Sequence, residues 1–265
     1  MKSQSFQQSG ENSKDLLKLT VSFISLFTLY HLAEYMIMFK NNVAGFFIFQ
    51  LLFFFMAYLS GNWYSKNGLG TWGLPFTKKM FLPFMIGLTG GILLYAIPLI
   101  ITTSLGIEKI VTFPAFADIV RLSLPFAFGV LFSSISEDVL TRGLIYTHFK
   151  NRIKPLGLVI LSATIYLLNH IYRLNDGIET LLYIFLLGIV FIIPVIHTKN
   201  LWLTGAMHWA GNTFFFVSHS VIKTEENNSL LSSNYVFVLC LVVFIPITWF
   251  MAKYFFARPG NTLTT

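Results

Sequence analysis

The segment Leu122–Thr147 reads LSLPFAFGVLFSSISEDVLTRGLIYT. A helix needs about 20 mostly apolar residues to cross a hydrocarbon core of roughly 30 Å, and this segment is long enough to do so. It nevertheless contains three charged residues, Glu137, Asp138 and Arg142. An ionisable side chain at membrane depth costs about 2.5 kcal/mol or more, so each one needs a partner or a task. The segment therefore predicts a membrane helix that carries a polar site.

The composition of the whole chain excludes a water-soluble globule. Of the 265 residues, 55% are hydrophobic and 11% are charged, and the mean hydropathy is +0.70. Soluble domains are about one quarter charged. The formal net charge is +7, but the basic residues are scattered singly between apolar runs, so we expect no nucleic-acid partner. The single cysteine, Cys240, excludes a disulfide framework and a cysteine zinc site.

A window of about 20 residues finds eight candidate membrane spans. The fold class predicted from them is all-α: a polytopic bundle that forms a single integral membrane domain over residues 1–265, in the plasma or inner membrane if the source is bacterial. The predicted spans are Leu19–Phe39, Val43–Asn62, Met80–Ser104, Leu122–Thr147, Leu156–Tyr172, Ile178–Ile196, Leu201–Ile222 and Tyr235–Ala257.

The distribution of Lys and Arg predicts the orientation, because cytoplasmic connections carry the excess of positive charge. With Arg142 set aside as intramembrane, one set of connections holds twelve basic residues and the other holds five. The richer set includes both chain ends, so we expect both termini to be cytoplasmic. Its members are Lys2, Lys14, Lys18, Lys66, Lys78, Lys79, Lys150, Arg152, Lys154, Lys199, Lys253 and Arg258. The poorer set consists of Lys40, Lys109, Arg121, Arg173 and Lys223.

Spacing on the fourth span separates its three charges into two groups. Asp138 and Arg142 are i and i+4, so they share a helical face and can form an ion pair that offsets much of the cost of burying both. Glu137 points about 100° away from that face. We therefore expect Glu137 to find its partner on another span.

Two other spans offer polar partners for Glu137. Tyr166 and His170 share a face of the fifth span, and His208 and Asn212 share a face of the seventh. Counted at 1.5 Å per residue from the predicted cytoplasmic ends, Glu137, His170, His208 and Asn212 all lie about 12 to 20 Å deep. Four polar groups from three helices at one depth are compatible with a shared cavity.

These motifs resemble the CPBP family, which contains type II CAAX prenyl endopeptidases and bacteriocin-processing proteins and is also called the Abi family. The resemblance rests on Glu137-Asp138-x-x-x-Arg142, on Tyr166-x-x-x-His170 and on His208-x-x-x-Asn212, in this order on separate apolar helices. It covers the family core, about residues 122–216. Two positions depart from the family pattern: Asp138 stands where Glu is usual, and Tyr166 stands where Phe is usual.

The resemblance implies an intramembrane endopeptidase that activates water without a covalent intermediate. Carried over by motif, Glu137 is the general base, and His170 helps to hold the water. His208 and Asn212 then donate hydrogen bonds to the oxyanion. Asp138, Arg142 and Tyr166 form the supporting shell, with Arg142 as a candidate contact for a substrate carboxylate. The implied partners are a peptide or protein substrate, including a membrane-associated one, and the lipid bilayer.

Three alternatives remain open at this stage. We expect no cofactor, but Glu137, His170 and His208 are the residue types of a His2Glu zinc site with water as the fourth ligand. A non-catalytic membrane protein, such as a peptide immunity factor or a scaffold, would keep the same pocket for binding. A transporter would use the carboxylate and imidazoles to relay protons. His31 and Glu34, at i and i+3 of the first span, are interpreted as a helix-packing pair.

Overall fold

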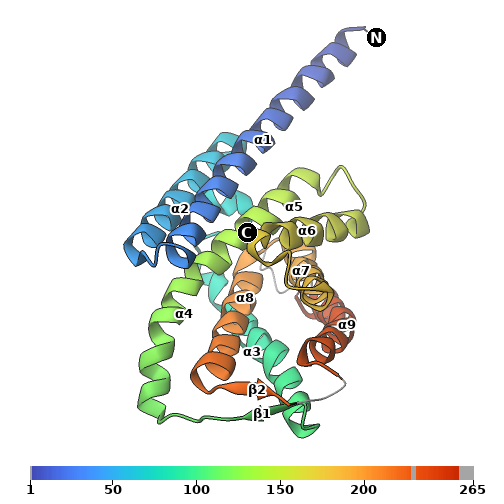
Figure 1. The fold of residues 1–265 in the computed structure, drawn as a ribbon. Coiled ribbons are helices and arrows are strands. Elements are labelled where there is room, and N and C mark those ends of the chain that lie inside the picture. Colours follow the sequence, from blue (N-terminus) through green and yellow to red (C-terminus); the bar gives the residue numbers. More distant parts are fainter. Residues whose placement is uncertain (1, 228–230, 257–265) are drawn as a thin grey trace.

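The computed structural model describes residues 2–227 and 231–256, and almost all of them are helical (Figure 1). A small antiparallel pair of strands, β1 and β2, joins two connections at one end of the bundle. The helices are α1 (Lys2–Met38), α2 (Val43–Ser65), α3 (Phe81–Ser104), α4 (Phe116–Asp138), α5 (Leu144–Phe149), α6 (Pro155–Asn169), α7 (Ile178–Thr198), α8 (Leu201–Phe216) and α9 (Ser233–Met251). The strands are β1 (Glu108–Ile110) and β2 (Thr224–Glu226).

Every one of the eight predicted spans overlaps a helix, so the all-α membrane bundle is confirmed. Among the described residues, six helices are long and apolar enough to cross a membrane: α1, α2, α3, the continuous α4–α5 segment, α7 and α9. Helix α6 is shorter, and α8 runs on into a π turn at Val217–Val221. The number of crossings and the side that the termini face stay predictions. Ala257 and Arg258, which entered those predictions, lie outside the described residues.

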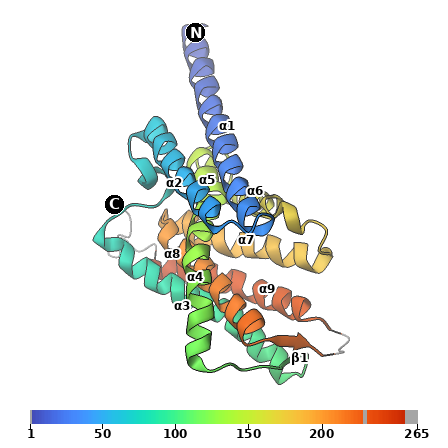
Figure 2. The same cartoon turned by 60° about the vertical axis from the view of Figure 1, so that its left-hand side comes forward.

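Connections that were predicted to share a membrane side do lie at the same end of the bundle. At one end, Arg152 pairs with Asp15 at 2.8 Å, and the Leu201 amide donates to the Gly73 carbonyl at 2.8 Å. At the other end, β1 pairs with β2. Figure 2 shows this strand end far from the N terminus. These contacts agree with the predicted sidedness for the connections that they join, and the orientation of the whole bundle stays a prediction.

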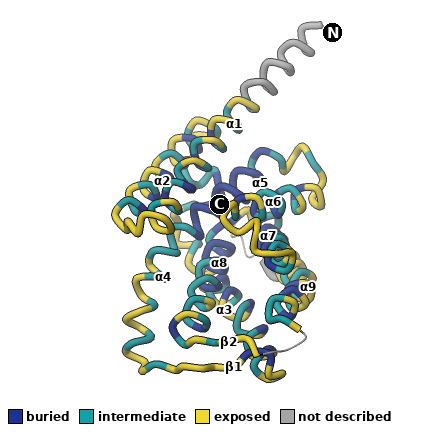
Figure 3. The backbone as a smooth tube through the Cα atoms, viewed as in Figure 1, coloured by how far each residue is buried: buried dark blue, intermediate teal, exposed yellow. Residues whose placement is uncertain are grey.

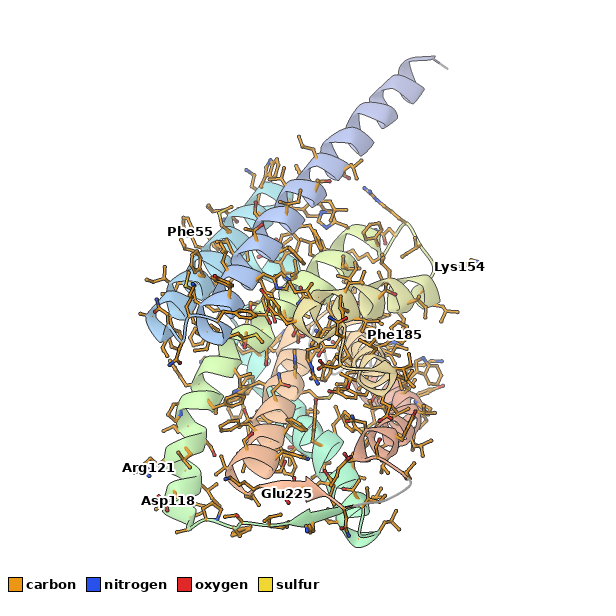
Figure 4. All side chains as sticks on the ribbon, viewed as in Figure 1. Phe55, Asp118, Arg121, Lys154, Phe185 and Glu225 are labelled. Carbon is orange, nitrogen blue, oxygen red and sulfur yellow. The ribbon has the colours of Figure 1, made fainter. Side chains whose placement is uncertain are left out.

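The outer faces of the helices carry large apolar side chains. Leu51 of α2, Ile100 of α3 and Leu239 of α9 are each more than 60% exposed, and Phe55 projects outward from α2 (Figure 4). A soluble monomer rarely exposes apolar patches on this scale. The buried residues gather where α5, α7 and α8 meet, and the lower half of α4 is largely exposed (Figure 3). The exterior is that of an integral membrane protein, with lipid as its solvent.

Two glycines let α3 approach α8 closely. A Cβ at Gly87 would lie 2.1 Å from the Leu203 carbonyl oxygen, and one at Gly91 would lie 2.1 Å from the Met207 carbonyl oxygen. Both contacts are with backbone atoms of α8, which cannot move without moving the helix. Small residues spaced four apart are a common way for membrane helices to pack. The spacing of these two glycines therefore sets the position of the turn of α8 that carries His208.

Gly91→Ala is expected to destabilise the protein by about 1–3 kcal/mol, because the added methyl group overpacks the α3–α8 contact. The matched control is Gly90→Ala, whose Cβ would meet only the flexible Met207 side chain, at 3.3 Å. Denaturation in mixed detergent micelles measures both variants. Equal stability of the two variants would contradict the close approach described above.

The buried acid Glu108 joins β1 to neighbouring segments at the strand end of the bundle. Glu108 of β1 is only 6% exposed; it accepts a hydrogen bond from the Thr102 hydroxyl and lies 3.3 Å from Nε2 of His219. Burial alone would raise the pKa of the Glu108 carboxyl, but the contacts with His219 and Thr102 outweigh burial and hold this pKa below its usual range.

Because its pKa is lowered in the folded state, Glu108 stabilises the fold above its ordinary pKa, and this contribution is lost as the pH falls through the lowered value. We expect the stability advantage of the wild type over Glu108→Gln to be full at neutral pH and to shrink below about pH 4. Melting curves against pH measure this difference. A difference that does not depend on pH would contradict the assignment; Glu225→Gln, on the exposed face of β2, is the control.

Candidate active site

Glu137 lies at the point where α4 stops being a regular α-helix. Residues Val139–Gly143 form a π turn before α5 continues, and π turns of this kind occur often at functional sites. Neighbouring hydroxyls bond the local carbonyl oxygens: Thr141 Oγ1 donates to the Glu137 carbonyl at 2.8 Å, and Ser162 Oγ of α6 donates to the Thr141 carbonyl at 2.8 Å. The wider turn is thus tied to α6, which carries the next part of the site.

The side chain of Glu137 meets groups from two other helices. Asn169 Nδ2 of α6 donates to Oε1 of Glu137 at 2.9 Å. His170 Nδ1 lies 3.6 Å from the same oxygen, and His208 Nε2 of α8 lies 3.6 Å from Oε2. Glu137 is 4% exposed and His208 is 3% exposed. The structure therefore brings together the carboxylate and both imidazoles that the sequence had placed at one depth.

Asp138 connects Arg142 to His208. Its Oδ1 accepts a hydrogen bond from Nη1 of Arg142 and lies 3.2 Å from Nδ1 of His208. The predicted i,i+4 ion pair is present, and both of its side chains are fully buried. A carboxylate oxygen can only accept, so the hydrogen bond between Asp138 and His208 is formed by the tautomer of His208 that carries a proton on Nδ1. The shorter aspartate, in place of the usual glutamate, still reaches both partners.

The guanidinium of Arg142 is enclosed by aromatic rings. Its central carbon lies 4.4 Å from the ring centroid of Tyr166 and 4.9 Å from that of Phe191, which is the geometry of cation–π contacts. Tyr166 also meets the rings of His170 and His208 edge-on, at 4.6 and 5.9 Å. Arg142 is fully buried and is not among the residues that line the cavity. Its contacts are with Asp138 and the aromatic rings, so it is not placed to contact a substrate carboxylate.

The fifth predicted span is shorter than the sequence suggested. We expected a helix to Tyr172, but α6 ends at Asn169 and His170 leaves the helical conformation, with φ −83° and ψ 52°. The Nδ1 atom of His170 lies 2.8 Å from the Tyr166 carbonyl oxygen, where a regular helix would place the His170 amide. The imidazole thus replaces a backbone donor at the helix end, and Nδ1 must carry a proton to do so.

These groups open into one cavity of about 230 Å³, lined among others by Glu137, Tyr166, His170, His208 and Asn212. Within the cavity wall, Asn212 Nδ2 of α8 donates to Ser134 Oγ of α4 at 3.3 Å. All four residues expected to do chemistry therefore face the same space.

One nitrogen of His170 is not available to a metal ion. Within the described part of the chain, no group of three His, Cys, Asp or Glu side chains is arranged to hold one. The nitrogen of His170 that faces Glu137 bonds the Tyr166 carbonyl and is protonated, and a protonated nitrogen cannot ligate a metal. The zinc arrangement considered from the sequence would therefore have to use Nε2 of His170, and the expectation that no metal is needed stays a prediction.

Sequence reasoning missed two parts of this site. The first is Asn169, which bonds Glu137. Its position directly before His170 was the only feature of the sequence that could have indicated this role. The wall formed by Tyr30 and Glu34 of α1 comes from a distant span. The His31–Glu34 pair is present, with Nδ1 2.7 Å from Oε2, but Glu34 also faces the cavity.

The fold and the cavity together define a class of protein. It is a membrane helix bundle with a polar cavity that holds a buried glutamate and two histidines. Residues 120–214 match the model of the family described as Type II CAAX prenyl endopeptidase Rce1-like. The matched segment contains Glu137, His170, His208 and Asn212, so the part of the chain that supplies the cavity's polar groups is similar to this family of membrane endopeptidases. Searches of the curated proteins and of the solved structures found no match.

The Asp138–Arg142 pair gives a direct test of the site's architecture. Asp138→Ala or Arg142→Ala alone is expected to destabilise the protein by about 3–5 kcal/mol, because each leaves an uncompensated buried charge. The double variant is expected to lose much less than the sum of the two. Denaturation in mixed micelles measures the cycle, and strictly additive losses would show that the two side chains do not interact.

Proposed function

We propose that the protein hydrolyses a peptide bond within the membrane by means of water activated by Glu137. The observation that carries the proposal is the placement of Glu137 at 3.6 Å from an imidazole nitrogen on each side. A gap of this size is too long for a direct hydrogen bond, and a water on the cavity side can be bonded to the carboxylate and an imidazole together.

In this proposal, Glu137 removes a proton from the water, whose oxygen attacks the peptide carbonyl carbon. The tetrahedral intermediate then collapses as Glu137 passes that proton to the leaving amine, which gives a carboxylic acid and an amine, and the acid then loses its own proton to water or to the amine. Asn169 holds Oε1 of Glu137 through its 2.9 Å hydrogen bond and so directs the base. The proton balance requires no covalent enzyme intermediate and no metal ion.

The oxyanion of the intermediate is bonded by His208 and Asn212. Since Nδ1 of His208 already donates to Asp138, its Nε2 can donate to an oxyanion only when the ring is protonated on both nitrogens. Oδ1 of Asp138 lies 3.2 Å from Nδ1 of this ring, and Oε2 of Glu137 lies 3.6 Å from its Nε2. A cationic donor in a low-dielectric cavity stabilises developing negative charge more strongly than a neutral one does.

Purified protein in proteoliposomes with a quenched-fluorescence peptide library tests the function. Glu137→Gln is expected to reduce kcat by at least about 10²-fold, and Asn212→Ala by about 10²–10³-fold with little change in KM. The control is Asp118→Asn, near the exposed N-terminal end of α4 (Figure 4), which should cleave peptides at the wild-type rate.

Three outcomes would contradict the proposal. Peptide binding without cleavage by the wild type favours a binding protein. Proton-coupled uptake of peptide, without cleavage, favours a transporter. Loss of cleavage after chelation, with recovery on adding zinc, favours a metal-bound site over the metal-free one.

A further inference from the structure

One wall of the cavity comes from helices outside the segment that matches the family. Five of the twelve lining residues belong to α1 and α2, whereas the family match begins at residue 120. They are Tyr30, Glu34, Ile37, Met38 and Phe46. The groups for the reaction and this second wall are thus supplied by different parts of the chain. A wall that touches the substrate but takes no part in the reaction can only affect which substrate is bound.

Glu34 is the only charged residue of that wall, and its side chain is held in place. Nδ1 of His31 lies 2.7 Å from Oε2 of Glu34, and the His31 ring is packed against Phe27 and Tyr30, with centroids 4.2 and 5.2 Å apart. The Glu34 side chain is 23% exposed. A carboxylate offers about four acceptor positions, so the hydrogen bonds of Glu34 to His31 and Tyr30 leave others for a group bound in the cavity.

The charges around the cavity favour a cation. Two carboxylates, Glu34 and Glu137, line it, and no Lys or Arg is among its described lining residues. Arg142, the nearest buried cation, is neutralised by Asp138. Coulombic attraction is stronger in a partly buried site than in water. Beside Glu34, the side chains of Ile37 and Met38 offer an apolar surface on which the alkyl stem of Lys or Arg can lie while its charged end reaches the carboxylate.

We propose that Glu34 is a specificity-determining residue, which selects substrates with a Lys or Arg side chain next to the bond that is cut. This inference rests on the proposed function, since it assigns a subsite of the same cavity. Glu34 does not exchange protons with the reacting atoms. Its replacement therefore changes which peptide is bound and leaves the groups around Glu137 in place.

Binding in an inactive background tests the inference separately from proteolysis. The probes are fluorescent peptides in which Lys, Gln or Glu is scanned through each position of one otherwise constant sequence, and anisotropy is measured with Glu137→Gln protein in nanodiscs. At one or two adjacent positions, Lys peptides should bind about tenfold more tightly than Gln peptides, the effect of one hydrogen bond to a charged group. Glu peptides should bind most weakly.

Adding Glu34→Gln should abolish the preference for Lys without weakening the binding of Gln peptides, because glutamine keeps the shape of the side chain and can still accept from His31. Adding Glu34→Lys should reverse the preference in favour of Glu. The control is Glu225→Gln, on β2 (Figure 4), which should change neither. Melting temperatures verify that each variant is folded.

Equal binding of Lys, Gln and Glu peptides, or a Lys preference that survives Glu34→Gln, would overturn the inference. A loss of binding for all three peptide types would also overturn it, since that result assigns Glu34 a purely structural role. Failure of the wild type to cleave any peptide would count against the proposed function instead, because the binding comparison does not depend on cleavage.

Discussion

The rest of the structure depends on the cost of keeping the Glu137 carboxylate inside a membrane bundle. A charge at that depth is tolerated only when polar groups replace water around it. Asn169 supplies a direct hydrogen bond, and His170 and His208 approach from two helices. This requirement favours the meeting of α4, α8 and the end of α6 at one level, and the same contacts that make the carboxylate tolerable also place it beside two imidazoles.

Two features of the backbone make that convergence possible. The π turn at Val139–Gly143 places Arg142 over the ring of Tyr166, where the guanidinium pairs with Asp138 and not with Glu137. The glycines at 87 and 91 allow α3 to support α8 at backbone distance, which leaves the opposite face of α8 for His208 and Asn212. Glu137 thus lines the cavity, while the second acid, Asp138, is paired with Arg142 away from it.

The sequence predicted the helices and the main polar groups because both have strong local signals. Apolar runs define spans, and a glutamate with no partner on its own helix must be met by another helix. Sequence did not predict the end of α6 at Asn169, since the side chain of His170 replaces a backbone donor there. Nor did it predict that Glu34 faces the cavity: the spacing of His31 and Glu34 gives their pairing, but only the packing of α1 shows what lies beyond it.

The most direct measurement of the central claim is an experimental density map of the protein in a lipid nanodisc at a resolution that shows ordered water. The account predicts that Glu137 is bonded to Asn169 and that a peak of the strength of water, and not of a metal, lies within hydrogen-bonding distance of its carboxylate and of one of the two imidazoles. A Glu137 side chain that faces acyl chains, or that lies out of reach of both His170 and His208, would contradict it.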